Sequence, residues 1–168
     1  MRIQNRIVLG FAVALTMTSA ASAQRRAVPA TPAQVGVAIT LQIAGQPYRF
    51  EGNGICQHAP VASIYNVRAE MWGVQQSDGQ RSIMLTLWRP KSMSGDMVSL
   101  GVVTGGKSYV VNTIKPGGQG SVASSGKVTF AASGGGGTFT IDAMAANGGA
   151  ITGTIQCSAF TYPMVEGG

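Results

Sequence analysis

Residues 35–43 read VGVAITLQI, and this stretch decides the fold class. Its apolar side chains alternate with small or polar ones, so that one face of an extended chain carries Val35, Val37, Ile39, Leu41 and Ile43. A period of two is the pattern of a β-strand that buries one face. The stretch therefore predicts a strand at the start of the folded body.

The rest of the chain repeats short apolar runs between turns. Asp78-Gly79, Thr104-Gly105-Gly106 and Asn147-Gly148-Gly149 are typical hairpin turns, because these residues tolerate the positive φ that tight turns require. No segment after residue 34 shows the helical period of 3.6. We expect an all-β fold of about nine short strands, an antiparallel β-sandwich with Greek-key or immunoglobulin-like connections.

The N-terminal residues have a different pattern. Arg2 and Arg6 precede an apolar run from Ile7 to Met17, and the small residues Ala21-Ser22-Ala23 follow. This order is typical of a secretory signal peptide. The run is too short for a membrane-spanning helix, which needs about 20 apolar residues.

We therefore expect a cleaved signal peptide over residues 1–23, a flexible Pro/Ala-rich tether over 24–34 and a single sandwich domain over 35–165. The mature form is expected to have no transmembrane segment and to lie in the periplasm or outside the cell. It keeps ten basic side chains against six acidic ones, and they are scattered along the chain. Because no basic stripe accompanies a nucleic-acid-binding motif, we do not expect a nucleic acid as partner.

The two cysteines, Cys56 and Cys157, can be interpreted as a disulfide or as part of a metal site with His58, the only histidine. Export favours the disulfide, because oxidising compartments form and keep such bonds. A zinc site would need a fourth ligand, and the segment around Cys157 supplies no second one. We expect a Cys56–Cys157 disulfide, an ordinary strand-end or loop role for His58, and no cofactor.

Two registers are open for the hairpin at Asp78-Gly79. A two-residue turn sets Trp72 beside Leu85 and Trp88 beside Ala69. A turn with an odd number of residues reverses one strand relative to the other. We favour the odd turn because it separates the charges from the apolar face, which then consists of Tyr65, Val67, Met71, Ile83, Leu85 and Leu87.

In the favoured register Trp72 and Trp88 point outward beside Arg68 and Arg89. Exposed aromatic and arginine side chains are typical of contact surfaces, so these four residues are the candidate interaction surface, for an envelope protein or a polysaccharide. The alternative is that a tryptophan packs under the loop Pro90–Met97.

No arrangement of residues predicts catalysis. The lone histidine neighbours a cysteine that we expect to be oxidised, and no serine has a G-x-S-x-G context. Met93 and Met97 offer thioether sulfur suited to Cu(I). We therefore expect a non-enzymatic protein, with a periplasmic small-ligand or metal-ion binding protein as the alternative.

The C-terminal half has a recognisable layout. A glycine-rich strand, GQGSVASSGKVTF (118–130), is followed by GTFTIDAM (137–144) and by ITGTIQC (151–157), whose cysteine can pair with Cys56. Over residues 50–160 this layout resembles the small mycobacterial lipoprotein antigens, although this chain has no cysteine after the signal to carry a lipid. The resemblance implies an exported, disulfide-stapled β-sandwich that acts as an envelope component or a binding module.

Overall fold

The computed structural model describes residues 32–64, 66–92, 95–114 and 124–162. Within these ranges the chain forms strands and no helix: β1 Val35–Ile43, β2 Gln46–Ile64, β3 Val67–Ser77, β4 Ser82–Pro90, β5 Met97–Thr104, β6 Lys107–Asn112, β7 Ser125–Ser133, β8 Gly136–Met144 and β9 Ala150–Cys157. The expectation of an all-β fold with about nine strands is confirmed. The predicted signal peptide, most of the predicted tether and Tyr65 lie outside the described residues.

The nine strands form one antiparallel sheet in the order β6-β5-β4-β3-β2-β1-β9-β8-β7. Every strand lies beside its neighbours in sequence except at the β6–β7 seam, and β9 pairs with β1. The sheet is thus nearly closed and barrel-like, with β6 and β7 as its end strands. The expected Greek-key or immunoglobulin-like sandwich was wrong. Short strands with tight turns suit either architecture, and only the pairing of β1 with β9 distinguishes them.

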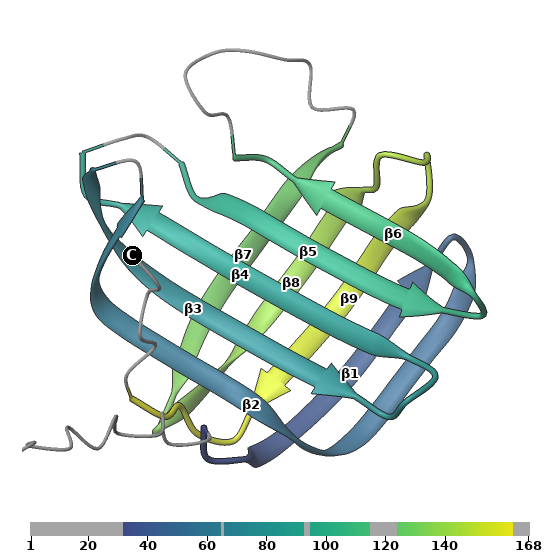
Figure 1. Cartoon of the computed structure of the whole chain (residues 1–168), viewed down its shortest axis with the longest axis horizontal. Helices are drawn as coiled ribbons and strands as arrows, with labels where there is room; N and C mark the ends of the chain where they lie inside the picture. The colour runs from purple at the N-terminus through teal and green to yellow at the C-terminus, as the bar shows by residue number, and fades with distance from the viewer. Residues whose placement is uncertain (1–31, 65, 93–94, 115–123, 163–168) are drawn as a thin grey trace, which may run out of the picture. The chain divides into compact units, whose positions relative to one another are not determined.

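The curled sheet forms two layers, β2 to β6 in front and β7, β8, β9 and β1 behind (Figure 1). Strand β2 belongs to both layers, because it pairs with β1 as far as Gly54 and with β3 from Ile55 onward. A Cβ at Gly54 would lie 2.9 Å from the carbonyl oxygen of Gln75 and 2.9 Å from a methyl group of Val37. The strand therefore changes layer at a residue with no side chain.

The core lies between the two layers. Ile39 and Leu41 of β1 belong to one fully buried cluster with Leu85 of β4, Leu100 of β5 and Phe139 of β8. The alternating face predicted for residues 35–43 is buried from Val37 onward, and Val35 is partly buried. Burial of this continuous apolar set is the main force that holds the layers together.

One polar pair lies inside the core. The Tyr48 hydroxyl donates a 2.8 Å hydrogen bond to Oε1 of Gln76, whereas Nε2 of Gln76 has no partner among the described residues. Burial raises the pKa of Tyr48, so its hydroxyl keeps its proton. The pair satisfies two of the polar atoms that β2 and β3 bring into the interior.

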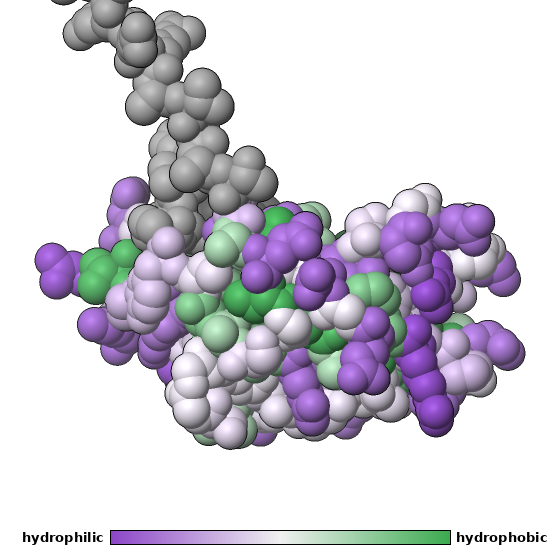
Figure 2. Space-filling view, turned by 90° about the horizontal axis from the view of Figure 1, so that it is seen from below, coloured by the Kyte–Doolittle hydropathy of each residue, from purple (hydrophilic) through white to green (hydrophobic). Residues whose placement is uncertain are grey.

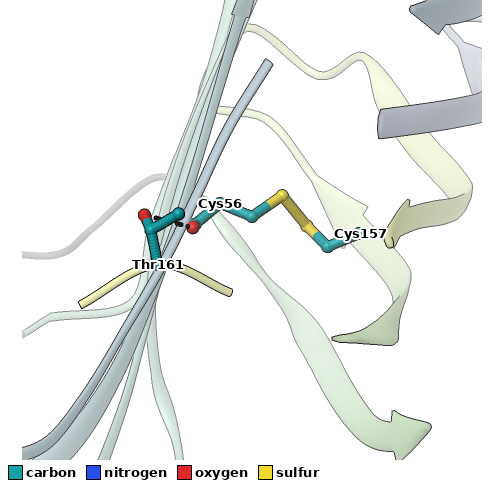
Figure 3. The surroundings of a disulfide bond; sticks show 3 residues. All are labelled: Cys56, Cys157 and Thr161. Carbon is teal, nitrogen blue, oxygen red and sulfur yellow. Dashed lines mark hydrogen bonds between the residues drawn. A yellow bond between two sulfur atoms is a disulfide. The ribbon is translucent and has the colours of Figure 1, made fainter. Parts of the chain in front are cut away.

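The Cys56–Cys157 disulfide is confirmed, and it joins β2 of the front layer to β9 of the rear layer (Figure 3). The two Cα atoms are 6.2 Å apart and 101 residues apart in sequence. Thr161 lies beside the bond, and its backbone N–H donates to the carbonyl of Cys56 at 2.9 Å. The described ranges contain no helix that is long and apolar enough to cross a bilayer.

Candidate functional site

The β3–β4 hairpin has a four-residue turn, Asp78 to Arg81, because Ser77 pairs with Ser82. The turn is even, so Trp72 lies opposite Leu87 on the inner face. The favoured odd register was wrong, and so was the two-residue register that set Trp72 beside Leu85. Trp72 is 3% exposed and belongs to the main core.

The error has a physical cause. Arg68 and Glu70 precede Trp72 on the same side of β3, and because of these charges that side was expected to face solvent. These charges lie near one end of the strand, where Arg68 is exposed and Glu70 partly exposed, although the inner face farther along carries Val74. A charged side chain near the end of a strand can reach solvent even when the rest of that face of the strand is buried.

Trp88 lies on the opposite side of the front layer. It is half-buried, pairs with Met71, and packs in a small cluster with Ala59 and Ala62. Its indole Nε1 is buried without a partner among the described residues. Trp72 and Trp88 therefore do not share one surface. Of the predicted set of Trp72, Trp88, Arg68 and Arg89, the structure places Arg89 against Trp72, whereas Trp88 lies on the other side of the sheet.

Trp72 instead organises a group that we call the end cluster: His58, Glu70, Trp72, Arg89, Asp96 and Tyr162. The imidazole of His58 on β2 stacks on the indole with ring centroids 5.0 Å apart. The guanidinium carbon of Arg89 on β4 lies 5.0 Å from the same ring. Because β2 and β4 flank β3, the ring is contacted from both neighbouring strands.

Ion pairs and hydrogen bonds hold both groups in place. Arg89 donates to Asp96 through two hydrogen bonds of 3.1 and 3.0 Å, and these bonds raise the pKa of Arg89, which stays charged. Nε2 of His58 lies 2.8 Å from Oε1 of Glu70, and Nδ1 lies 3.0 Å from the hydroxyl of Tyr162. With the proton on Nε2, His58 donates to the carboxylate and accepts from the tyrosine.

The last described residues, 158–162, form what we call the C-terminal strap. The His58 N–H donates to the carbonyl of Thr161, and the Phe160 N–H donates to the carbonyl of Gly135. The Phe160 ring contacts Phe130 and Phe139 at the edge of the core. The strap thus closes the interior beside the disulfide.

The end cluster is suited to closing the sheet rather than to chemistry. Both ring nitrogens of His58 are already bonded, and one ring face is covered by Trp72. His58 was expected to be an ordinary strand-end or loop residue, and this was wrong: it lies within β2, opposite Trp72 of β3. His58 lies opposite Trp72 because of the register between β2 and β3, which shifts between Ala59 and Ala62. No pattern in the sequence predicts this shift.

Metal ligands do not gather in the described residues, where no group of three or more His, Cys, Asp or Glu side chains could hold an ion. Both cysteine sulfurs are in the disulfide. Met93 lies outside the described residues, and Met97 pairs with Trp88 at the start of β5.

A surface hollow lies on the outward face of the front layer, the face turned to the reader in Figure 1. This outer groove has a volume of about 500 Å³ and crosses β3, β4 and β5, where the register aligns Gln75, Met84 and Gly101. Met84 is 56% exposed and Val103 39% exposed. A Cβ at Gly101 would meet no atom within 4 Å, so the missing side chain leaves the floor open.

The rim of the outer groove is polar and uncharged. Among the described residues, its lining includes the amides and hydroxyls of Gln34, Asn53, Gln75, Ser77, Ser82 and Ser108, and no Lys, Arg, Asp or Glu. Figure 2 shows a different face of the molecule, on which apolar residues form small patches between hydrophilic ones. No sequence pattern predicted the groove, because it depends on how β3, β4 and β5 are aligned.

No family model, curated protein or solved structure matches the chain. The outer groove and the end cluster are therefore interpreted from their own geometry. Of the two, only the groove offers exposed apolar side chains around open space. It is the stronger candidate for a binding site.

Proposed function

We propose that the protein is an exported, disulfide-stapled binding module without enzymatic activity, and that it binds through the outer groove. One observation carries the proposal: exposed Met84 and Val103 border the open floor at Gly101 within an uncharged polar rim. Apolar hollows with a few convergent polar groups are the usual form of binding sites. Apolar side chains that stay exposed to water also mark contact surfaces, because their exposure is unfavourable unless a partner covers them.

The chemistry of the groove favours a segment of a partner protein over a polysaccharide. None of the lining residues that the structure describes is aromatic. Methionine is flexible and polarizable, so Met84 suits apolar side chains of varied shape. The absence of charge in the lining favours an uncharged segment, because a buried charge would find no counter-charge there.

Export is supported by the disulfide, because such bonds form and persist in oxidising compartments. The signal-like order of residues 1–23 agrees with this location. Periplasmic or extracellular placement, and the resemblance to the lipoprotein antigens, remain predictions. A small ligand, the alternative, would use the same outer groove. A metal ion finds no group of three or more His, Cys, Asp or Glu side chains in the described part of the chain.

A photo-crosslinking side chain at position 84 tests the binding proposal in the producing cell. The expected result is an adduct with a discrete partner protein. A matched probe at Thr140, exposed on the outward face of the rear layer, should give none. Adding Gly101→Leu to the position-84 probe should remove the adduct, because the leucine fills the groove without meeting other atoms at its Cβ. Equal labelling from positions 84 and 140, or labelling that survives Gly101→Leu, would contradict the proposal.

A further inference from the structure

Strand β7 is an end strand with one open side. It pairs with β8, and no other strand pairs with it among the described residues. Figure 1 shows β7 as an edge strand of the rear layer, next to β8. A free strand edge presents unpaired N–H and C=O groups, which is a template for adding another strand.

The other end strand, β6, is not open in the same way. The N–H of Ala146 donates to the carbonyl of Val110, and the side-chain amide of Asn147 donates to the carbonyl of Ser108. Ser124 bonds both the N–H and the carbonyl of Asn112. The turn before β9 and the residue before β7 thus occupy the edge of β6, and β7 is left without a partner on that side.

The turn geometry identifies which groups of β7 face the open side. Ser133 and Gly136 close a two-residue turn, and in such a hairpin the closing pair exchanges both hydrogen bonds. Odd-numbered residues of β7 therefore bond to β8. The N–H and C=O groups of the even-numbered residues, Gly126, Val128, Phe130 and Ala132, are directed to the free edge.

The side chains of β7 leave this edge accessible. Lys127 is the one charged residue of the strand, and Ser125, Ala131, Ala132 and Ser133 are small and exposed. A cleft of about 510 Å³ separates the first half of β7 from the start of β5, lined by Gly95, Asp96, Val98, Gly126, Lys127 and Val128. The first half of β7 therefore borders open space on the side of β5.

We infer that two copies of this chain assemble by pairing their β7 strands edge to edge in antiparallel orientation, centred on Thr129. This register overlaps all nine residues and sets Val128 opposite Phe130 of the partner subunit, both with edge-directed backbone groups. It also sets Lys127 opposite Ala131 of the partner subunit, so the like charges do not meet. The partner's Ala132 is on the same face as Val128, and its small side chain lies beside the cleft at β5. A β7 edge thus matches a second β7 edge in both hydrogen bonding and charge.

The assembly is independent of the outer groove, which lies on β3, β4 and β5. Sedimentation equilibrium of the purified, oxidised protein over a wide concentration range at low salt should show a reversible monomer–dimer equilibrium. Ala131→Glu should tighten the dimer about fivefold, because it creates two cross-strand pairs with Lys127, and Ala131→Lys should weaken it similarly. Ala131 is exposed, so neither change disturbs the core.

Two further variants test the register. Lys127→Glu combined with Ala131→Lys should restore tight pairing, because the opposite charges again face each other. Ala132→Pro should abolish the dimer, because it removes an edge-directed N–H while the bonds to β8 remain. Circular dichroism of each variant checks that the fold is kept. A protein that stays monomeric throughout, or a dimer indifferent to the charge at position 131, would overturn the inference.

Discussion

The imidazole of His58 and the indole of Trp72 lie parallel, with ring centroids 5.0 Å apart and planes inclined by 7°. This stack joins β2 to β3 beside the C-terminal strap, whose Thr161 carbonyl accepts a hydrogen bond from the His58 N–H. His58 also bonds Glu70 and Tyr162, so one side chain connects the aromatic core edge to two polar groups. The lone histidine of the chain is therefore a closing element of the sheet.

Replacing His58 by Ala should lower the free energy of unfolding by about 2 kcal/mol, because it removes the ring stack and leaves Glu70 without its partner. His58→Phe keeps a ring against Trp72 but not the hydrogen bonds, and should lose about half as much. Urea denaturation followed by tryptophan fluorescence measures both. An unchanged midpoint for His58→Ala would show that the stack contributes nothing.

Removing the disulfide with Cys56→Ala and Cys157→Ala together should cost about 4 kcal/mol of stability, because the bond closes a loop of 101 residues in the unfolded chain. Alanine leaves no polar atom in these buried positions. Guanidinium denaturation of the variant, and of the reduced wild type as a control, should give matching midpoints. Thiol titration of the unreduced, denatured wild type should find no free thiol.

Tyr48→Phe should destabilise the protein by about 1–2 kcal/mol, because Gln76 would then be buried with neither end of its amide bonded. Adding Gln76→Leu should recover this loss, since the core then contains no unpaired polar atom at that position. Thermal unfolding of the two single variants and the double variant completes the cycle. Additive losses in the double variant would contradict the expected coupling.

The turn at Asp78 should make stability depend on pH. Hydrogen bonds from the backbone N–H and then from the side chain of Arg81 hold the pKa of Asp78 below its ordinary value of 3.8. A carboxyl whose pKa is lowered by folding stabilises the fold above its unfolded pKa. This contribution should be lost as the pH falls through 3.8 toward the folded value.

Urea midpoints of wild type and Asp78→Asn, measured from pH 7 down to pH 3, check this pH dependence. The wild type should be the more stable at pH 7, and the difference should shrink below pH 4. A constant difference over this range would mean that the charge of Asp78 is not the cause.

Two strand glycines should respond oppositely to alanine. Gly54→Ala should cost about 2 kcal/mol, because the new Cβ would lie 2.9 Å from the Gln75 carbonyl oxygen where β2 changes layer. Gly101→Ala should be neutral or slightly stabilising, because its Cβ meets open space in a central strand. Thermal unfolding of the two variants, compared directly, measures the effect. Equal losses would mean that space at the layer change is not limiting.

Strand content, turn positions and the cysteine pair could be predicted from the sequence, because each depends on local patterns. Alternation in residues 35–43 requires only the two-residue period, and Gly79 has the positive φ expected of its turn. The register of β3 against β4 could not be predicted in the same way. It depends on whether the turn holds an even or odd number of residues, and the local sequence allowed both.

The sequence by itself predicted the strands of the described body, because the two-residue period is a local property of the chain. It favoured a Cys56–Cys157 disulfide because two cysteines allow one pairing, and the structure shows that the two Cα atoms lie 6.2 Å apart. Only the tertiary structure decided that Trp72 faces inward, that His58 stacks on it and that β1 pairs with β9. These outcomes follow from the strand order and from the closure of the sheet. They bring together residues far apart in the chain, and local patterns do not encode which distant strands meet.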